Sequence, residues 1–256
     1  MEMVEKAVAK SLMDIKAVML RPEQPFTWAS GWFSPIYCDN RRILSYPEIR
    51  ENVCRWMADI VKKQYPDVEV IAGVATGAIA MGALVADLLN LPFVYVRSAP
   101  KDHGLENLIE GDLRPGMKVV VVEDLISTGG SSLKAVQAIR NNGCEVIGMV
   151  ASYTYGFDVA EKAFKEADVE LVTLTNYEAV LEVAQETGDL FQRHGSSEDV
   201  DVQNPADLFH IIPLAPGRGE ESPLHPVLHR VGLQTGNVGD RIELVIGYLY
   251  LKGGIL

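Results

Sequence analysis

The chain has 256 residues, of which 48% are hydrophobic and 23% are charged, and its formal net charge is −12. This length gives room for one large domain or two small ones with a sizeable core, and the composition is ordinary for a globular protein. The negative charge argues against nucleic-acid binding, because a phosphate backbone would be repelled, but it leaves room for a local cationic site.

Cysteine usage and the N-terminus bear on the compartment. Cys38, Cys54 and Cys144 are odd in number and widely spaced, so neither a disulfide framework nor a zinc site is indicated. Residues 1–15 are charged and amphipathic, unlike a signal peptide, and no run approaches the ~18 apolar residues of a membrane span. We therefore expect a cytoplasmic protein with no membrane partner.

The expected elements, taken in chain order, predict an α/β fold. An opening amphipathic helix is expected within residues 3–18, followed by a stretch of loop and short strand that is rich in Pro, Gly and aromatic residues. Further helices are expected at about 47–63, 77–89, 131–143 and 161–167, and strands at 68–75, 92–96, 118–124, 145–153 and 169–174. Near-continuous Val/Ile strands that alternate with helices indicate a doubly wound, mainly parallel sheet with helices on both faces.

Two segments break this rhythm. Residues 97–117 have no clear periodicity, and loops of about 20 residues inside a compact domain are usually functional or mobile. The segment contains Arg97, Lys101 and His103, which form a cationic cluster in an acidic protein. From about residue 190 the chain is rich in proline and histidine, and it has no helical or βα rhythm until residues 241–251, which could be one strand.

The stretch VVVVEDLISTGGSS, residues 119–132, carries the clearest functional signal. A buried strand ends in Glu123 and Asp124, and ligands bind at the carboxyl ends of strands in open α/β sheets. The turn STGGS then exposes N–H groups at a helix N-terminus, which favours a phosphate. The acids would repel a bare phosphate but suit ribose hydroxyls, with Mg²⁺ nearby. The pattern therefore points to a ribose phosphate; the alternative is an ordinary helix with a capping Ser or Thr.

The same stretch resembles the phosphoribosyl-diphosphate (PRPP) signature of the type I phosphoribosyltransferases, and more narrowly the chain is similar to the orotate phosphoribosyltransferases. The matching segments are 25–50, 68–84, 95–104, 109–132 and 171–188. The resemblance implies a domain over residues 1–189, with an N-terminal helix and hood at about 1–45 and a core at about 46–189. Residues 190–256 are then an atypical C-terminal extension, for which disorder is one interpretation.

The resemblance implies transfer of the 5-phosphoribosyl group from PRPP to orotate, which yields orotidine 5′-monophosphate and diphosphate in pyrimidine biosynthesis. It also implies Mg²⁺ held mainly by PRPP, and a homodimer whose loop residues are shared across the interface. The expected PRPP contacts are Arg97, Lys101, His103, Glu123, Asp124, Leu125, Ile126, Ser127, Thr128, Gly129, Gly130 and Ser131. The expected orotate contacts are Ser127, Ile36 and Tyr37, and the expected catalytic residues are Lys101, His103 and Asp124.

The chemistry of such a transfer is consistent with these roles. Breaking the bond between C1 and the diphosphate builds positive charge on the ribose ring and negative charge on the leaving group. Carboxylates beneath the ring stabilise the first, while Mg²⁺ and cationic side chains stabilise the second. Lys101 supplies a flexible point charge, and His103 could supply a proton or a hydrogen bond.

Three departures from the family pattern keep alternatives open. Phe33 stands where the family commonly has Lys, and Ser98 and Ala99 occupy the place of a second loop lysine. The turn at 75–80 reads ATGAIA instead of ATAGIP, which could change which residue tolerates a positive φ. The alternatives are another type I phosphoribosyltransferase with a different base pocket, and a PRPP-binding regulator with weakened catalysis.

Overall fold

The computed structural model describes residues 2–21, 26–27, 33–34, 36–99 and 108–188. The chain divides into one unit of Met1–Met19 and Tyr37–Asp189 and a second unit of Leu20–Ile36 and Leu190–Leu256. The described part of the second unit contains an antiparallel pair, β2 (Phe26–Thr27) and β3 (Phe33–Ser34). None of the described helices is both long and apolar enough to cross a membrane.

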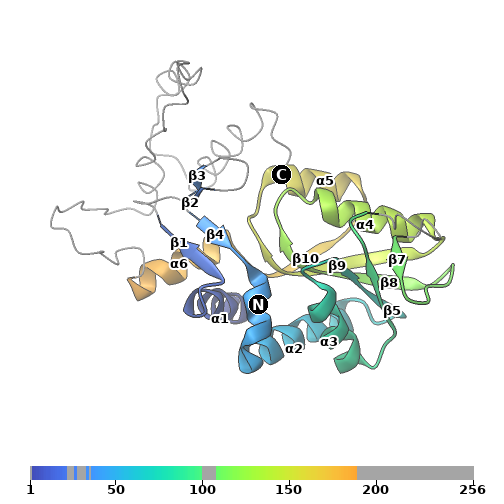
Figure 1. The fold of residues 1–256 in the computed structure, drawn as a ribbon, viewed down its shortest axis with the longest axis horizontal. Coiled ribbons are helices and arrows are strands. Elements are labelled where there is room, and N and C mark those ends of the chain that lie inside the picture. Colours follow the sequence, from blue (N-terminus) through green and yellow to red (C-terminus); the bar gives the residue numbers. More distant parts are fainter. Residues whose placement is uncertain (1, 22–25, 28–32, 35, 100–107, 189–256) are drawn as a thin grey trace, which may run out of the picture. The chain divides into compact units, whose positions relative to one another are not determined.

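The first unit is built on a six-stranded sheet in the order β10-β9-β8-β5-β6-β7 (Figure 1). Its strands are β5 (Val70–Val74), β6 (Phe93–Val96), β7 (Ile109–Glu110), β8 (Lys118–Ile126), β9 (Glu145–Thr154) and β10 (Leu171–Asn176). All neighbours pair in parallel except β6 and β7, which are antiparallel. The expected mainly parallel sheet is therefore confirmed.

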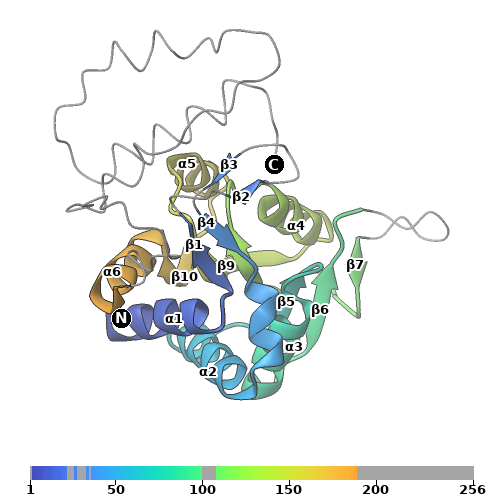
Figure 2. The same ribbon diagram turned by 60° about the vertical axis from the view of Figure 1, so that its left-hand side comes forward.

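Helices cover both faces of this sheet (Figure 1, Figure 2). They are α1 (Glu2–Asp14), α2 (Pro47–Gln64), α3 (Ile79–Leu89), α4 (Gly130–Asn141), α5 (Asp158–Glu166) and α6 (Tyr177–Thr187), with a short 3-10 helix η1 (Asn40–Ser45). In both views α2 and α3 lie on one side of the sheet, and α4 and α5 lie on the other. This is the doubly wound arrangement that the alternating pattern predicts.

The central strand β8 shows why its sequence is apolar on both sides. Val119, Val120, Val121 and Val122 are all fully buried. Val119 and Val121 belong to the buried cluster that includes side chains of α4 and α5. Because successive side chains of a strand point to opposite faces, Val120 and Val122 face the other helical layer. Because both faces of this strand are buried, its residues are apolar on both sides and do not alternate with polar ones.

From α2 onward, two elements were not predicted, β7 and α6. β7 has two residues and pairs only with the end of β6, so it is too short to give a periodic signal. α6 follows β10 without a break, because Asn176 ends the strand and also caps the helix: its Oδ1 accepts a hydrogen bond from the N–H of Ala179 at 2.9 Å. The junction therefore has no glycine or proline to mark it in the sequence.

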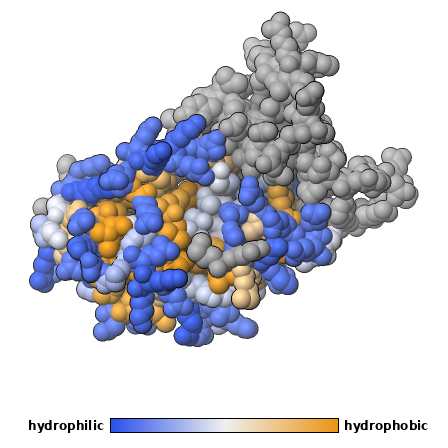
Figure 3. All heavy atoms as spheres, turned by 180° about the vertical axis from the view of Figure 1, so that it is seen from behind, coloured by the Kyte–Doolittle hydropathy of each residue, from blue (hydrophilic) through white to orange (hydrophobic). Residues whose placement is uncertain are grey.

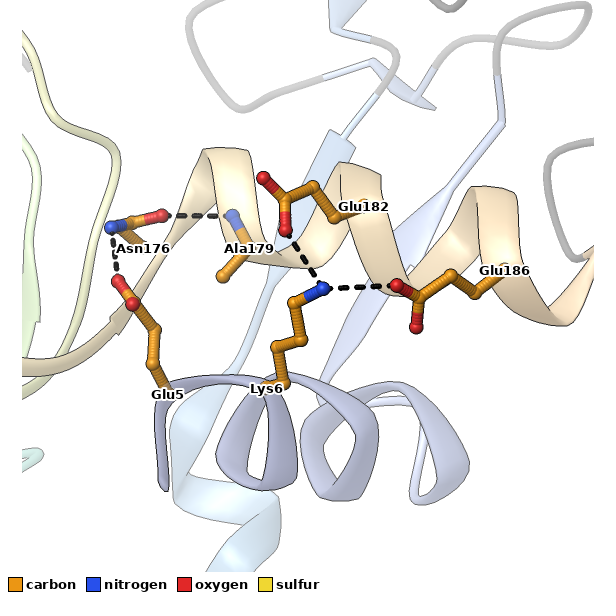
Figure 4. A network of polar contacts seen from close by, with 6 residues as sticks. All are labelled: Glu5, Lys6, Asn176, Ala179, Glu182 and Glu186. Carbon is orange, nitrogen blue, oxygen red and sulfur yellow. Dashed lines mark hydrogen bonds and ion pairs between the residues drawn. The ribbon is translucent and has the colours of Figure 1, made fainter. Parts of the chain in front are cut away.

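The N-terminal helix α1 packs against α6 (Figure 4). Lys6 Nζ lies 3.1 Å from Glu182 Oε2 and 2.9 Å from Glu186 Oε1. Asn176 Nδ2 donates to Glu5 Oε1 at 2.6 Å. Exposed ion pairs contribute little to stability. Most of the free energy that holds α1 on the rest of the unit therefore comes from its fully buried side chains, which are Val8, Ala9 and Leu12.

The surface of the described residues carries a few large apolar side chains. Figure 3 shows apolar residues among hydrophilic ones on the face opposite to that of Figure 1. The large hydrophobic residues that are exposed are Met3, Tyr37, Tyr46, Leu84 and Leu88. Leu84 and Leu88 are four residues apart on α3, and thus lie on the same side of that helix.

Candidate active site

Two turns lie next to each other at the carboxyl ends of β5 and β8. The two strands are paired up to Gly73 and Val122, and the turn from Ala75 follows one while the turn from Ser127 follows the other. The strand order reverses at this point, since β6 lies on one side of β5 and β8 on the other. In open α/β sheets a ligand binds at such a reversal.

The turn after β8 has the features of an anion site. Gly129, which precedes α4, has φ of 80°, and a Cβ added there would lie 2.7 Å from the Phe164 ring, so glycine is required on two counts. No side chain caps α4 at Gly129. The first N–H groups of α4 therefore lack the usual side-chain partner and are available to an anion. The alternative of an ordinary capping Ser or Thr is thus wrong.

The two acids of β8 occupy different environments. Glu123 is 4% exposed; its Oε2 accepts a hydrogen bond from Ser132 Oγ at 2.8 Å, and its Oε1 accepts one from the N–H of Asp124 at 3.0 Å. Burial, and then the charge of Asp124, raise the pKa of Glu123 well above its ordinary value. Asp124 is partly exposed, so it is the more accessible acceptor.

The pKa of Asp124 is also raised, chiefly by burial, and this rise is opposed first by hydrogen bonding with Glu123 and, to a smaller extent, by the charge of Arg41. Burial therefore disfavours the charged form of both acids, and most strongly that of Glu123, which also faces the charge of Asp124. Asp124 is the acid that can meet a ligand, because it is the more exposed of the two.

The turn after β5 contacts Asp124. A Cβ on Gly77 would overlap the Asp124 carboxylate, so the side chain of Asp124 lies directly over this glycine. The sequence raised the question of whether the exchange in ATGAIA moves a position with positive φ. It does not, because no residue of this turn has a positive φ, and Ala78 has φ of −95°. Glycine is needed here because of space, and its backbone conformation is open to other residues.

The remaining residues of the predicted phosphate turn differ in exposure. Leu125, Ser127 and Thr128 are partly exposed, and Gly130 and Ser131 are exposed. Ile126 is fully buried, and its carbonyl accepts a hydrogen bond from the N–H of Tyr155 at 3.1 Å. Ile126 thus has a packing role, and its side chain is not accessible to a ligand.

The predicted cationic residues are described only in part. Arg97 follows β6; its N–H donates to the carbonyl of Leu108 at 2.8 Å, and its Nη1 lies 3.7 Å from Glu110 Oε1. Lys101 and His103 lie outside the described residues. The prediction that residues 97–117 form a single loop is wrong at Ile109–Glu110, which pair with β6 as β7.

Two of the three predicted orotate contacts, Ile36 and Tyr37, lie on β4 (Ile36–Cys38), which pairs with β1 (Val18–Leu20), whereas Ser127 begins the turn after β8. Ile36 is buried, whereas Tyr37 is 37% exposed, so of the two only Tyr37 has an accessible side chain. Phe33 belongs to β3.

Sequence reasoning missed three polar residues around the two acids. Ser132 bonds the Glu123 carboxylate, and the buried side chains of Asn40 and Ser152 bond the main chain of Asp124. Ser132 lies in the quoted motif as the third residue of α4, so its position in the sequence could have indicated a contact with the neighbouring strand. Asn40 and Ser152 have no such signal, since they are remote from Asp124 in sequence.

Comparison with known proteins agrees with this geometry. A model of the phosphoribosyl transferase domain matches residues 39–186, which include all six strands of the sheet. The orotate phosphoribosyltransferase of Bacteroides fragilis is 71% identical over 188 residues, which are 73% of this chain and 89% of that protein. That of Porphyromonas gingivalis is 61% identical over 202 residues, which are 79% of this chain and 94% of that protein.

A solved structure is similar as well. The orotate phosphoribosyltransferase from Aeropyrum pernix has a TM-score of 0.59 and 28% sequence identity, over 71% of this chain and 98% of that one. Fold and domain match define the class as a phosphoribosyltransferase. Within that class, the chain belongs to the orotate phosphoribosyltransferase family.

Proposed function

We propose that this protein transfers the 5-phosphoribosyl group from PRPP to orotate, giving orotidine 5′-monophosphate and diphosphate in pyrimidine biosynthesis. The observation that carries the proposal is the uncapped N-terminus of α4 a few residues after the partly exposed Asp124. A carboxylate that accepts hydrogen bonds from a diol and a set of N–H groups that donate to a phosphate thus lie a few residues apart, as suits the hydroxyls and the phosphate of a ribose 5-phosphate. The similarity to relatives that bear the name orotate phosphoribosyltransferase supports the choice of base.

The binding roles follow from exposure. In the proposal, the N–H groups from Ser127 to Ser131 and the hydroxyls of the same turn hold the 5′-phosphate. Asp124 accepts hydrogen bonds from the ribose hydroxyls, and Glu123 completes the pair from its buried position. Ser127, Tyr37 and Ile36 are the proposed orotate contacts.

The proposed catalytic groups divide by the charge they stabilise. Asp124, beneath the ribose, stabilises the positive charge that develops as the bond to diphosphate breaks. Lys101, His103 and Arg97 stabilise the leaving diphosphate, and Lys101 is suited to follow the leaving oxygen because its stem is flexible. His103 holds a proton for that oxygen or donates a hydrogen bond to it.

Mg²⁺ is part of the proposal as an ion carried by the diphosphate of PRPP. Within the described residues, no three His, Cys, Asp or Glu side chains gather into a metal site. Mg²⁺ does not require such a cluster, because it is usually bound through one or two carboxylates plus substrate phosphates and keeps several waters. Asp124 is the accessible carboxylate, and the bound ion would neutralise charge on the leaving diphosphate.

The assembly and the compartment are also proposed. The family relationship supports a homodimer that shares the loop residues, and the exposed Leu84 and Leu88 of α3 are suited to an interface. The free thiols Cys38, Cys54 and Cys144 support a reducing cytoplasm. We further propose a catalytic domain over residues 1–189 and a separate extension over residues 190–256.

The test is a steady-state assay of the purified chain with PRPP, Mg²⁺ and orotate, following the loss of orotate absorbance. Turnover with orotate and none with hypoxanthine is the expected result. Turnover with hypoxanthine alone would favour another phosphoribosyltransferase, and PRPP binding by calorimetry without turnover would favour a regulator. Lys101→Ala should lower kcat by roughly 100-fold or more with the fold intact, whereas the control Lys10→Ala, on the exposed side of α1, should leave it unchanged.

A further inference from the structure

A closed group of buried polar side chains lies beneath Asp124. Asn40, the first residue of η1, is 1% exposed, and Ser152 of β9 is fully buried. Asn40 Nδ2 donates to the main-chain carbonyl of Asp124 at 2.6 Å and to Ser152 Oγ at 3.1 Å. Ser152 Oγ donates to the same carbonyl at 2.9 Å. One carbonyl thus accepts hydrogen bonds from two side chains that belong to different elements.

The orientation of the Asn40 amide is fixed from its other side. Cys38 Sγ donates to Asn40 Oδ1 at 3.4 Å. Burial, followed by the nearby Asp124 and Asp39 carboxylates, raises the pKa of the Cys38 thiol, so the thiol keeps the proton it donates. Because a main-chain carbonyl can only accept, the amide nitrogen of Asn40 must face Asp124. Each polar atom of the amide therefore has a partner.

This group lies where the sheet stops supporting β8. The pairing of β5 with β8 ends at Val122, whereas the pairing of β9 with β8 continues to Ile126. Beyond Val122, β8 has a strand neighbour on one side only among the described residues. Asn40 of η1 and Ser152 of β9 hold the main chain of Asp124 in this stretch.

We propose that Asn40 and Ser152 are positioning residues for the phosphoribosyl transfer: they fix the main chain of Asp124 and so hold its carboxylate over Gly77, where it meets the ribose. This inference rests on the proposed function. The carboxylate is separated from its own Cα by a single methylene, so a shift of the Asp124 main chain moves it directly. Displacements of about 1 Å at a reacting centre can cost roughly 100-fold in rate.

The variants Asn40→Ala, Asn40→Asp and Ser152→Ala separate this role from plain packing. Asn40→Ala removes one donor and is expected to lower kcat/KM for PRPP roughly 10-fold, and Ser152→Ala, which leaves Asn40 in place, by less. Asn40→Asp keeps the shape but sets a carboxylate against the Asp124 carbonyl. It should therefore cost the most, and it should move the acidic limb of the kcat/KM profile to higher pH, since a second negative charge raises the pKa of Asp124.

The experiment measures kcat, KM for PRPP and KM for orotate between pH 5 and 9, roughly, together with the melting temperature of each variant. Val8→Ala removes buried volume from α1, which packs against α6 and β10, and is the control for loss of stability alone. Kinetic losses beyond those of Val8→Ala, together with the pH shift in Asn40→Asp, support the proposal. Variants that lose stability as Val8→Ala does but keep wild-type kinetics and pH profile would overturn it.

Two further results are distinguishable from these. If Asn40→Ala does not fold, Ser152→Ala and Asn40→Asp test the proposal. Kinetic constants in both variants equal to those of the wild type would then contradict a positioning role. If the wild-type chain itself does not turn over orotate, the proposed function fails. In that case calorimetric affinity for PRPP in the same variants still tests the inference, and unchanged affinity would refute it.

Discussion

The carboxylate of Asp124 lies over Gly77, in the space that a β-carbon at that position would fill. This contact joins the turn after β5 to the end of β8, the two segments that meet at the reversal of strand order. The glycine of the ATGAIA turn therefore determines where a carboxylate on the neighbouring strand can lie. Because Gly77 has no side chain, the Asp124 carboxylate of β8 has room to lie there.

Gly77→Ala should displace the Asp124 carboxylate and lower kcat/KM for PRPP by roughly 10-fold or more. The melting temperature should change little, because the obstructed atoms are the end of a partly exposed side chain and Gly77 does not have a positive φ. A double-mutant cycle with Asp124→Ala is the control. If the effect runs through Asp124, adding Gly77→Ala to Asp124→Ala causes no further loss; additive losses would contradict this.

Glu123→Gln should stabilise the protein most at high pH. The folded protein raises the pKa of Glu123 above its ordinary value of 4.5, so the folded state binds this proton more tightly than the unfolded state does. The corresponding stability is fully present below pH 4.5 and is lost as the pH rises through the folded pKa. Gln carries no charge to bury, so the difference in melting temperature between variant and wild type should widen from about pH 4.5 upward. A constant difference from pH 4 to 9, roughly, would refute the buried-carboxyl assignment.

Gly129→Ala should lower the free energy of unfolding by about 2–4 kcal/mol, because it combines backbone strain with overlap against the Phe164 ring. Gly116→Ala is a matched control: its φ of 88° imposes similar strain, but nothing lies within 4 Å of the added carbon. The control should cost only about 1 kcal/mol. Urea unfolding of both variants measures the difference, and equal losses would show that Phe164 yields to the added methyl group.

Leu12→Ala should cost about 2–5 kcal/mol, since this side chain of α1 is fully buried. Lys6→Ala should barely change the melting temperature, because its two ion pairs with Glu182 and Glu186 are exposed and screened by salt. Thermal melts at low and high salt check both expectations. A large, salt-sensitive loss in Lys6→Ala would show that the polar contacts hold α1 in place.

Much of the fold could be predicted because the strands of the sheet carry their own signal. The Val/Ile runs of β5, β8 and β9 are continuous and lie between helical segments, so the local sequence alone indicates strands that are buried on both faces. α6 was missed because Asn176 serves both the strand and the helix, which removes the usual boundary. β7 depends entirely on its partner β6, and a tertiary pairing of two residues leaves no local trace.

The residues of the candidate site also fall into those that the sequence could predict and those that it could not. The acids and the phosphate turn could be found because they follow one another on one strand, turn and helix. Asn40 and Ser152 could not, since they are 84 and 28 residues away from Asp124 and meet it only through the fold. The roles assigned to the residues of the turn, and to Lys101 and His103, remain predictions from the family pattern.

The contact between α1 and α6 also has a consequence for the order in which the chain can fold. Glu5 and Asn176 are 171 residues apart, and Lys6 and Glu186 are 180 apart. Of the described helices, a growing chain on the ribosome makes α1 first and α6 last, at a typical pace of about 5–20 residues per second. The contact between α1 and α6 can therefore form only roughly ten to forty seconds after α1 has been made. Of the described helices, the first to be synthesised is thus among the last to find its final neighbour.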